Sequence, residues 1–186
     1  MKSLWILLYI FLFCLPVFAK TEFPDSLLIG NVKVFIHPSA KSILESEQKR
    51  LGSSKKFVEG MKEKMRFYFP VMEPLLQSAG IPTEFKYLSV QESGLNPIAV
   101  SSSQAVGYWQ FKAGTATDVG MKVNAYVDER KHIIEATKGA ANYFTRNNRV
   151  LNNWVGTLLS YRIGLGTAKK TPYVMDWVGK SDIQVD

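Results

Sequence analysis

The chain has 186 residues, of which 46% are hydrophobic, and a formal net charge of +7 at pH 7. This length fits one folded domain with a sizeable core, and its single cysteine excludes an internal disulfide. The basic residues are scattered along the sequence, which favours a solvated surface and argues against a nucleic-acid-binding protein. The two histidines are far apart and lack ligand spacing, so no metal site is expected.

The first predicted element is a secretory signal peptide over residues 1–19. Lys2 precedes an apolar run of about 15 residues, which ends in small side chains at Ala19. A bilayer-spanning helix needs about 20 residues, so a retained membrane anchor is the less favoured alternative. Phe13 precedes Cys14, where a lipidated cysteine would need a small residue before it. We therefore expect export to the periplasm or cell envelope, with membrane attachment only through an uncleaved signal segment.

The next segment, residues 20–80, is predicted to be a lead-in followed by helices. Residues 20–31 have no clear pattern, whereas the alternation over residues 32–36 predicts a short strand. A mostly polar helix is then expected from Ser42, acting as N-cap, to Leu51.

Two more helices are predicted before residue 81, separated by a proline. Phe57–Phe69 has apolar residues near helical spacing, and Pro70 is expected to end this helix. Val71–Ala79 is expected to be a separate short helix, in which Pro74 is tolerable only in the first turn.

Residues 81–166 are expected to form the catalytic core, and residues 167–186 a short tail. Pro82 suits the start of the first core helix, and Gly94 suits its end. The helices predicted in this segment cover residues 82–93, 115–119 and 132–147, with a last one that places Trp154, Leu158 and Tyr161 on one face. The chain is thus predicted to be mainly α, with at most a minor β element.

Glu92 is the candidate catalytic acid. On the predicted helix, Phe85, Leu88 and Glu92 project from the same side. Desolvation on an apolar face raises the pKa of a carboxyl, as a general acid working near neutrality requires. The alternative is a solvent-facing glutamate near a helix end. Glu84 serves as a contrast, because its place in the first helical turn is explained by the helix dipole.

The loop after this helix has no second acid. Glycoside hydrolysis usually needs two carboxylates, about 5 to 9 Å apart. No Asp or Glu occurs between Gly94 and Gly114. The sequence therefore favours a single-acid mechanism, in which the substrate supplies its own nucleophile.

Two polar and aromatic clusters follow Glu92 and could line a sugar groove. Gly107–Gln110 offers two aromatic rings for stacking and an amide for hydroxyl and acetamido groups. Tyr161 is expected near a helix end, where its hydroxyl could reach a cleft. Buried aromatic side chains with satisfied polar atoms are the alternative in both cases.

In order and spacing, these blocks resemble the lytic transglycosylase domain of the lysozyme-like superfamily. The blocks are Glu92-Ser93, Gly107–Gln110 and Tyr161 with Gly164. Within that family, the helix before Glu92 and the Val127–Arg130 segment are similar to the membrane-bound murein transglycosylase D group.

The resemblance implies a lysozyme-like fold and non-hydrolytic cleavage of peptidoglycan glycan strands at the β-1,4 bond between N-acetylmuramic acid and N-acetylglucosamine. Glu92 would protonate the glycosidic oxygen and then act as base on the 6-hydroxyl, which closes a 1,6-anhydro ring. No metal or organic cofactor is implied. The residues expected to orient the substrate or line its groove are Ser93, Tyr108, Trp109, Gln110 and Tyr161.

Two features depart from the family pattern. Arg162 stands where the family commonly has asparagine, and it could pair with a substrate carboxylate or point outward. The tail after Gly166 is short. The alternatives are an inactive glycan-binding or scaffold module of an envelope complex and a lysozyme-type hydrolase on the same fold.

Overall fold

The computed structural model describes residues 24–185 and consists mainly of helices with one small sheet. Helices account for 60% of the chain, which confirms the predicted mainly α class with a minor β element. These described residues form two compact units, one made of residues 24–58 and 146–185, the other of Glu59–Thr145. The predicted signal peptide lies outside the described residues. Within residues 24–185, no helix combines the length and the hydropathy that a bilayer crossing requires.

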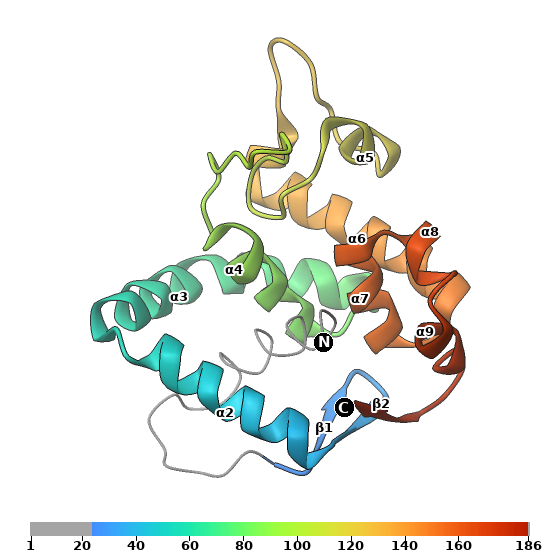
Figure 1. The fold of residues 1–186 in the computed structure, drawn as a ribbon. Helices are drawn as coiled ribbons and strands as arrows, with labels where there is room; N and C mark the ends of the chain where they lie inside the picture. The colour runs from blue at the N-terminus through green and yellow to red at the C-terminus, as the bar shows by residue number, and fades with distance from the viewer. Residues whose placement is uncertain (1–23, 186) are drawn as a thin grey trace. The chain divides into compact units, whose positions relative to one another are not determined.

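The sheet of the first unit joins the two ends of the described chain (Figure 1). β1 (Ser26–Ile29) pairs antiparallel with β2 (Val32–Ile36), and β3 (Asp182–Val185) pairs parallel with the other edge of β2. Alternate residues of β2 are buried, as predicted for this strand. β1 and β3 were not predicted, because each has four residues and β3 finds its partner about 150 residues away along the chain.

The helix α2 (Pro38–Gly52) begins earlier than the sequence pattern predicts. His37 is its N-cap and accepts a hydrogen bond from the Ser39 backbone N–H, so the predicted Ser42 cap is wrong. Ser42 lies inside the helix and donates to the Ser39 carbonyl. Pro38 at the first helical position starts the helix because its fixed φ suits that position.

The helix α3 (Lys55–Ser78) is continuous, so the predicted break at Pro70 is wrong. Each proline removes one helical N–H and leaves one carbonyl without its partner. Pro70 and Pro74 are four residues apart and exposed. Both unpaired carbonyls therefore lie on the solvent-facing side of the helix, where water can replace the missing hydrogen bonds. The buried side of the helix includes Met61, Met72 and Leu76.

In the second unit, short helices surround an aromatic core. The predicted helix over residues 82–93 is split into η1 (Thr83–Lys86) and α4 (Tyr87–Ser93), and Gly94 ends it in a left-handed conformation as expected. The Phe85 and Trp109 rings both pack edge-on against Phe144, with centroid separations of 4.8 and 5.9 Å. The remaining elements are α5 (Ala113–Asp118), η2 (Glu129–Lys131) and α6 (Ile133–Leu151).

The first unit is completed by α7 (Trp154–Ile163), α8 (Leu165–Ala168) and α9 (Pro172–Asp176). Asn153 caps α7 by accepting from the Gly156 N–H at 2.9 Å, and its amide donates to the Lys180 carbonyl. The Asn147 amide donates to the buried Ser160 hydroxyl at 2.8 Å, which joins the end of α6 to α7. The segment predicted as a short tail, residues 167–186, contains the end of α8, the helix α9 and the strand β3.

Candidate active site

Glu92 lies one residue before the end of α4 and is half-buried. Two residues on its own side of the predicted helix, Phe85 and Leu88, are 0% and 2% exposed. The T-shaped contact between Phe85 and Phe144 anchors this segment in the core of its unit. The backbone that carries Glu92 is therefore fixed by core packing, and its side chain is partly withdrawn from solvent.

Ser93 links the end of α4 to the Gly107–Gln110 segment. Its hydroxyl oxygen lies 2.9 Å from the Tyr108 carbonyl and 3.1 Å from the Ser89 carbonyl, and it accepts from the Asn96 N–H at 3.1 Å. The side chain next to Glu92 thus connects helix, turn and loop. Its position suits a residue that orients the neighbouring acid.

Gly107 is needed where the Gly107–Gln110 segment crosses η2. Its φ is +83°, and a Cβ added there would lie 1.9 Å from the Arg130 carbonyl oxygen. Its N–H donates to the Ala99 carbonyl at 2.9 Å. Gln110, also with positive φ, donates from its side-chain amide to the Ala99 and Gly107 carbonyls at 3.1 and 3.0 Å. The donor side of this amide therefore braces the loop.

Tyr108 and Trp109 do not occupy the groove-lining positions expected of them. Trp109 is 0% exposed, and its indole N–H donates to the Thr137 hydroxyl at 3.2 Å. Tyr108 is 5% exposed and packs edge-on against Tyr68. The pKa of Tyr108 is raised mainly by burial and to a smaller extent by a hydrogen bond with Tyr68. Stacking on a sugar ring needs an exposed aromatic face, so both rings act as core supports here.

Tyr161 belongs to the other unit, where it is half-buried on α7 between buried Ser160 and exposed Arg162. The structure therefore brings Glu92, Ser93 and the Gly107–Gln110 segment together within one unit.

The Asp128–Arg130 pair supports the Gly107–Gln110 segment and was given no role from the sequence. Arg130 is 8% exposed, and its Nε and Nη2 donate hydrogen bonds to the two carboxylate oxygens of Asp128 at 2.8 Å each. Its Nη1 donates to the Phe111 carbonyl at 3.2 Å. The Arg130 side chain thus bonds to one end of this loop, and its carbonyl oxygen lies close to Gly107 at the other end. The sequence signals for this pair were an acid and an arginine two residues apart and the family resemblance of the Val127–Arg130 segment, neither of which gave it a role.

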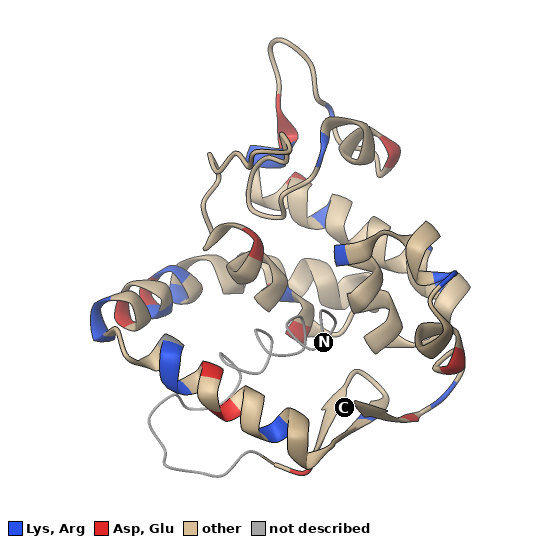
Figure 2. Ribbon diagram, in the orientation of Figure 1, with Lys and Arg blue, Asp and Glu red and all other residues tan. Residues whose placement is uncertain are grey.

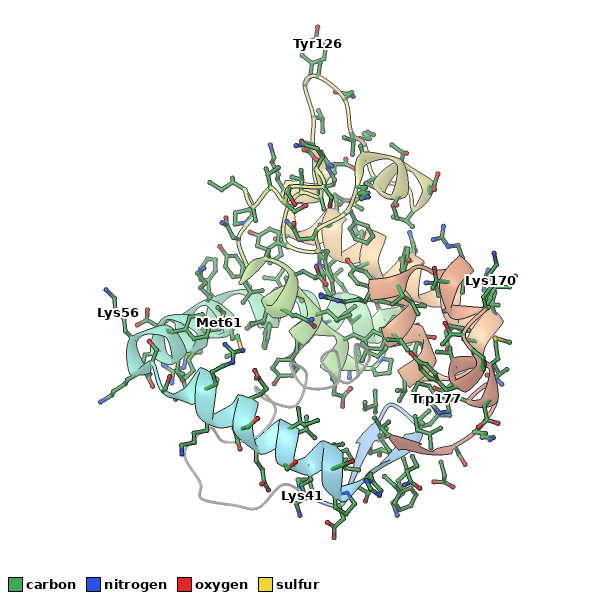
Figure 3. The ribbon with its side chains drawn as sticks, viewed as in Figure 1. Lys41, Lys56, Met61, Tyr126, Lys170 and Trp177 are labelled. Carbon is green, nitrogen blue, oxygen red and sulfur yellow. The ribbon has the colours of Figure 1, made fainter. Side chains whose placement is uncertain are left out.

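Two of the acids that follow Glu92 along the second unit serve the surrounding loops. Glu129 accepts from the Lys122 backbone N–H and Asp128 pairs with Arg130, while Asp118 is exposed on α5. The loop between these anchors presents Tyr126, which is 96% exposed at its tip (Figure 3). In residues 24–185, no three His, Cys, Asp or Glu side chains are grouped to hold a metal ion.

We expect the Asp128–Arg130 pair to make stability depend on pH. The hydrogen bonds from Arg130 hold the pKa of Asp128 below its usual range. A carboxyl with a lowered folded-state pKa stabilises the fold above its unfolded pKa of about 4, and this contribution is lost as pH falls through the folded pKa. Asp128→Asn should therefore lower the free energy of unfolding by about 2 kcal/mol at pH 7.

Denaturant unfolding at pH 7 and pH 3 measures this effect. The difference between wild type and Asp128→Asn should shrink at the lower pH, whereas Asp118→Asn, which changes an exposed acid, should have little effect at either pH. A difference of equal size at both pH values would contradict the ion-pair explanation.

Comparison with known proteins places this site in a described family. The transglycosylase SLT domain family matches residues 71–181, a range that includes Glu92, the Gly107–Gln110 segment and Tyr161. The chain is 27% identical over 145 residues to the membrane-bound lytic murein transglycosylase D of Escherichia coli strain K12, and equally to that of Escherichia coli O6:H1 strain CFT073. Each alignment covers 77% of this chain and 32% of the relative, so the chain spans about a third of those proteins.

Proposed function

The chain belongs to the transglycosylase SLT domain family, and we propose that it is a peptidoglycan lytic transglycosylase that cleaves the β-1,4 bond between N-acetylmuramic acid and N-acetylglucosamine. The observation that carries this proposal is the family match over residues 71–181, which includes Glu92 and the loop bonded to its neighbour Ser93. The murein transglycosylases among its relatives support the same substrate class.

In the proposed mechanism, Glu92 acts first as acid and then as base. Its carboxyl proton passes to the glycosidic oxygen as the bond from that oxygen to C1 of the muramic acid breaks. The resulting carboxylate takes the proton of the muramic acid 6-hydroxyl, whose oxygen bonds to C1 and closes a 1,6-anhydro ring. The carboxyl is regenerated and no water is consumed, so one acid is sufficient.

The acids that follow Glu92 along the chain support a one-acid mechanism. A second catalytic carboxylate would have to lie about 5 to 9 Å from the first. The loop after α4 has no acid, and Asp128 and Glu129 are engaged by Arg130 and the Lys122 N–H. An internal hydroxyl nucleophile removes the need for such a partner.

The other family positions have supporting roles in this proposal. Ser93 fixes the end of α4 relative to the Gly107–Gln110 segment, and Gln110 stiffens that segment by bonding its carbonyls. We assign Tyr161 to substrate orientation on its place in the family motif. A peptidoglycan substrate also requires export, in line with the leader expected over residues 1–19.

Mass spectrometry of the soluble products from purified peptidoglycan tests the proposal. We expect 1,6-anhydro ends from the wild-type chain. Reducing ends would instead indicate a lysozyme-type hydrolase. If no products form while the chain still co-sediments with peptidoglycan, the inactive glycan-binding alternative is correct. Arg162, which stands in place of the usual asparagine, would then be the first residue to test as the cause of inactivity.

A further inference from the structure

The two units of the chain differ in charge. In the unit formed by residues 24–58 and 146–185, twelve Lys and Arg stand against five Asp and Glu, a net charge of +7 (12 − 5). Residues 59–145 have nine of each, and their net charge is zero (9 − 9). The basic residues are scattered along the sequence, but the entire excess of positive charge in residues 24–185 lies on the unit that does not contain Glu92.

The excess is strongest over the last half of this unit. Residues 146–175 contain no Asp or Glu, and α7 and α8 show no acidic residue in Figure 2. We define the basic surface as Arg149, Arg162, Lys169 and Lys170, which are all exposed. Within residues 24–185, none of these four forms an ion pair, whereas Lys41, Arg50 and Lys180 of the same unit each have an acidic partner.

Helix packing fixes the elements that carry the basic surface. The Asn147 amide bonds to the Ser160 hydroxyl and the Thr157 hydroxyl to the Asn148 amide oxygen, which holds the end of α6 on α7. α8 follows α7 after Gly164 alone, and the Gly164 N–H is bonded to the Ser160 carbonyl. Arg149 and Arg162 are therefore carried on braced helices, while Lys169 and Lys170 lie in the turn directly after α8.

Like charges without acidic partners repel one another, and such a surface attracts an anionic partner. Arginine and lysine both bind carboxylates, and the arginine fork does so with two parallel hydrogen bonds. We propose that the basic surface binds the carboxylates of peptidoglycan and holds the chain on this polymer during cleavage. The inference rests on the proposed function for the identity of the polymer.

The helices α7, α8 and α9 favour a polymer over a lipid surface as the partner. Stable adsorption of a helix in the bilayer interface uses an exposed apolar face in addition to its basic residues. α7 buries Val155, Leu158 and Leu159, and α8 has four residues. α9 has two half-exposed apolar side chains on five residues, which is too short for an amphipathic helix.

The test compares two double variants of the full chain with equal charge changes, both made in a Glu92→Gln background that leaves the polymer intact. Lys169→Gln with Lys170→Gln neutralises half of the basic surface. Lys122→Gln with Lys138→Gln removes two exposed cations from the neutral unit. Co-sedimentation with purified sacculi should weaken about fivefold for the first pair and remain unchanged for the second.

Two further measurements identify the partner. Binding of the parent chain should fall as salt rises, and also when the sacculus carboxylates are converted to amides by carbodiimide coupling. Equal binding by both double variants, or equal binding to native and amidated sacculi, would overturn the proposal. The proposal would also be overturned if the Lys169→Gln, Lys170→Gln variant lost binding only to phosphatidylglycerol vesicles and not to sacculi. That result would assign the basic surface to lipid.

The failure of this inference can be told apart from failure of the proposed function, because the sedimentation assay does not depend on cleavage. Anhydro products from the wild type together with unchanged binding of the Lys169 and Lys170 variant would overturn the basic surface alone. Weakened binding of that variant, without products from the wild type, would support the basic surface and overturn the lyase.

Discussion

Replacement of Glu92 by glutamine is expected to lower the rate of peptidoglycan cleavage by at least about a thousandfold. Glutamine keeps nearly the same size and can form hydrogen bonds, but it cannot deliver a proton to the glycosidic oxygen. General acid–base catalysis by a positioned side chain typically contributes about 10² to 10⁴ in rate, and in this mechanism both transfers pass through the same carboxyl. Quantitative mass spectrometry of released anhydro-muropeptides gives the rate for each variant.

Glu84→Gln is the matched control for this prediction. Glu84 lies on η1, immediately before α4 in the same unit, so both substitutions replace a carboxyl by an amide on neighbouring elements. We expect Glu84→Gln to keep the rate within about twofold, since exposed and partly exposed surface changes rarely disturb the fold. If both variants lost activity equally, the loss would reflect charge or stability rather than the acid at residue 92.

Local signals were sufficient where one residue type decides the backbone. The alternation over residues 32–36 predicted β2, and Gly94 predicted the left-handed end of α4. Prolines misled the prediction, because their effect depends on position and exposure. Pro38 starts a helix, while Pro70 lies within one on its exposed side. Pairing between β2 and β3 could not be predicted, since neither strand's sequence specifies a partner so distant along the chain.

The sequence pointed to the candidate segments of the site, but not to the direction of their side chains. Spacing identified Glu92 and the Gly107–Gln110 segment, and the fold brings this segment to the neighbour of Glu92 through the Ser93 hydroxyl. The burial of Trp109 depends on Thr137 and Phe144, which lie 28 and 35 (144 − 109) residues later along the chain on α6. The role of Arg130 likewise exists only once its carbonyl meets Gly107.

Gly107→Ala is expected to have the largest effect on stability, lowering the free energy of unfolding by about 3 to 5 kcal/mol. Two costs combine at this position. A φ of +83° is strained for a residue with a Cβ, and the new atom would lie 1.9 Å from the Arg130 carbonyl oxygen, which belongs to backbone and cannot rotate away. The loop or η2 must move, and either movement disturbs the hydrogen bond from Arg130 to the Phe111 carbonyl. Denaturant titration followed by circular dichroism measures the loss.

Gly114→Ala separates this steric effect from the general cost of changing a glycine. Gly114 lies in the first turn of α5, its φ is not positive, and a Cβ there would meet nothing within 4 Å. Alanine is favoured over glycine in a helix by about 1 kcal/mol, so this variant should be as stable as wild type or slightly more so. Equal stability of the two variants would mean that the loop moves away from Arg130 at little cost. Activity of Gly107→Ala would then show whether cleavage needs the loop held against η2, because such a relaxed loop would keep the fold while altering the support of Ser93 and Glu92.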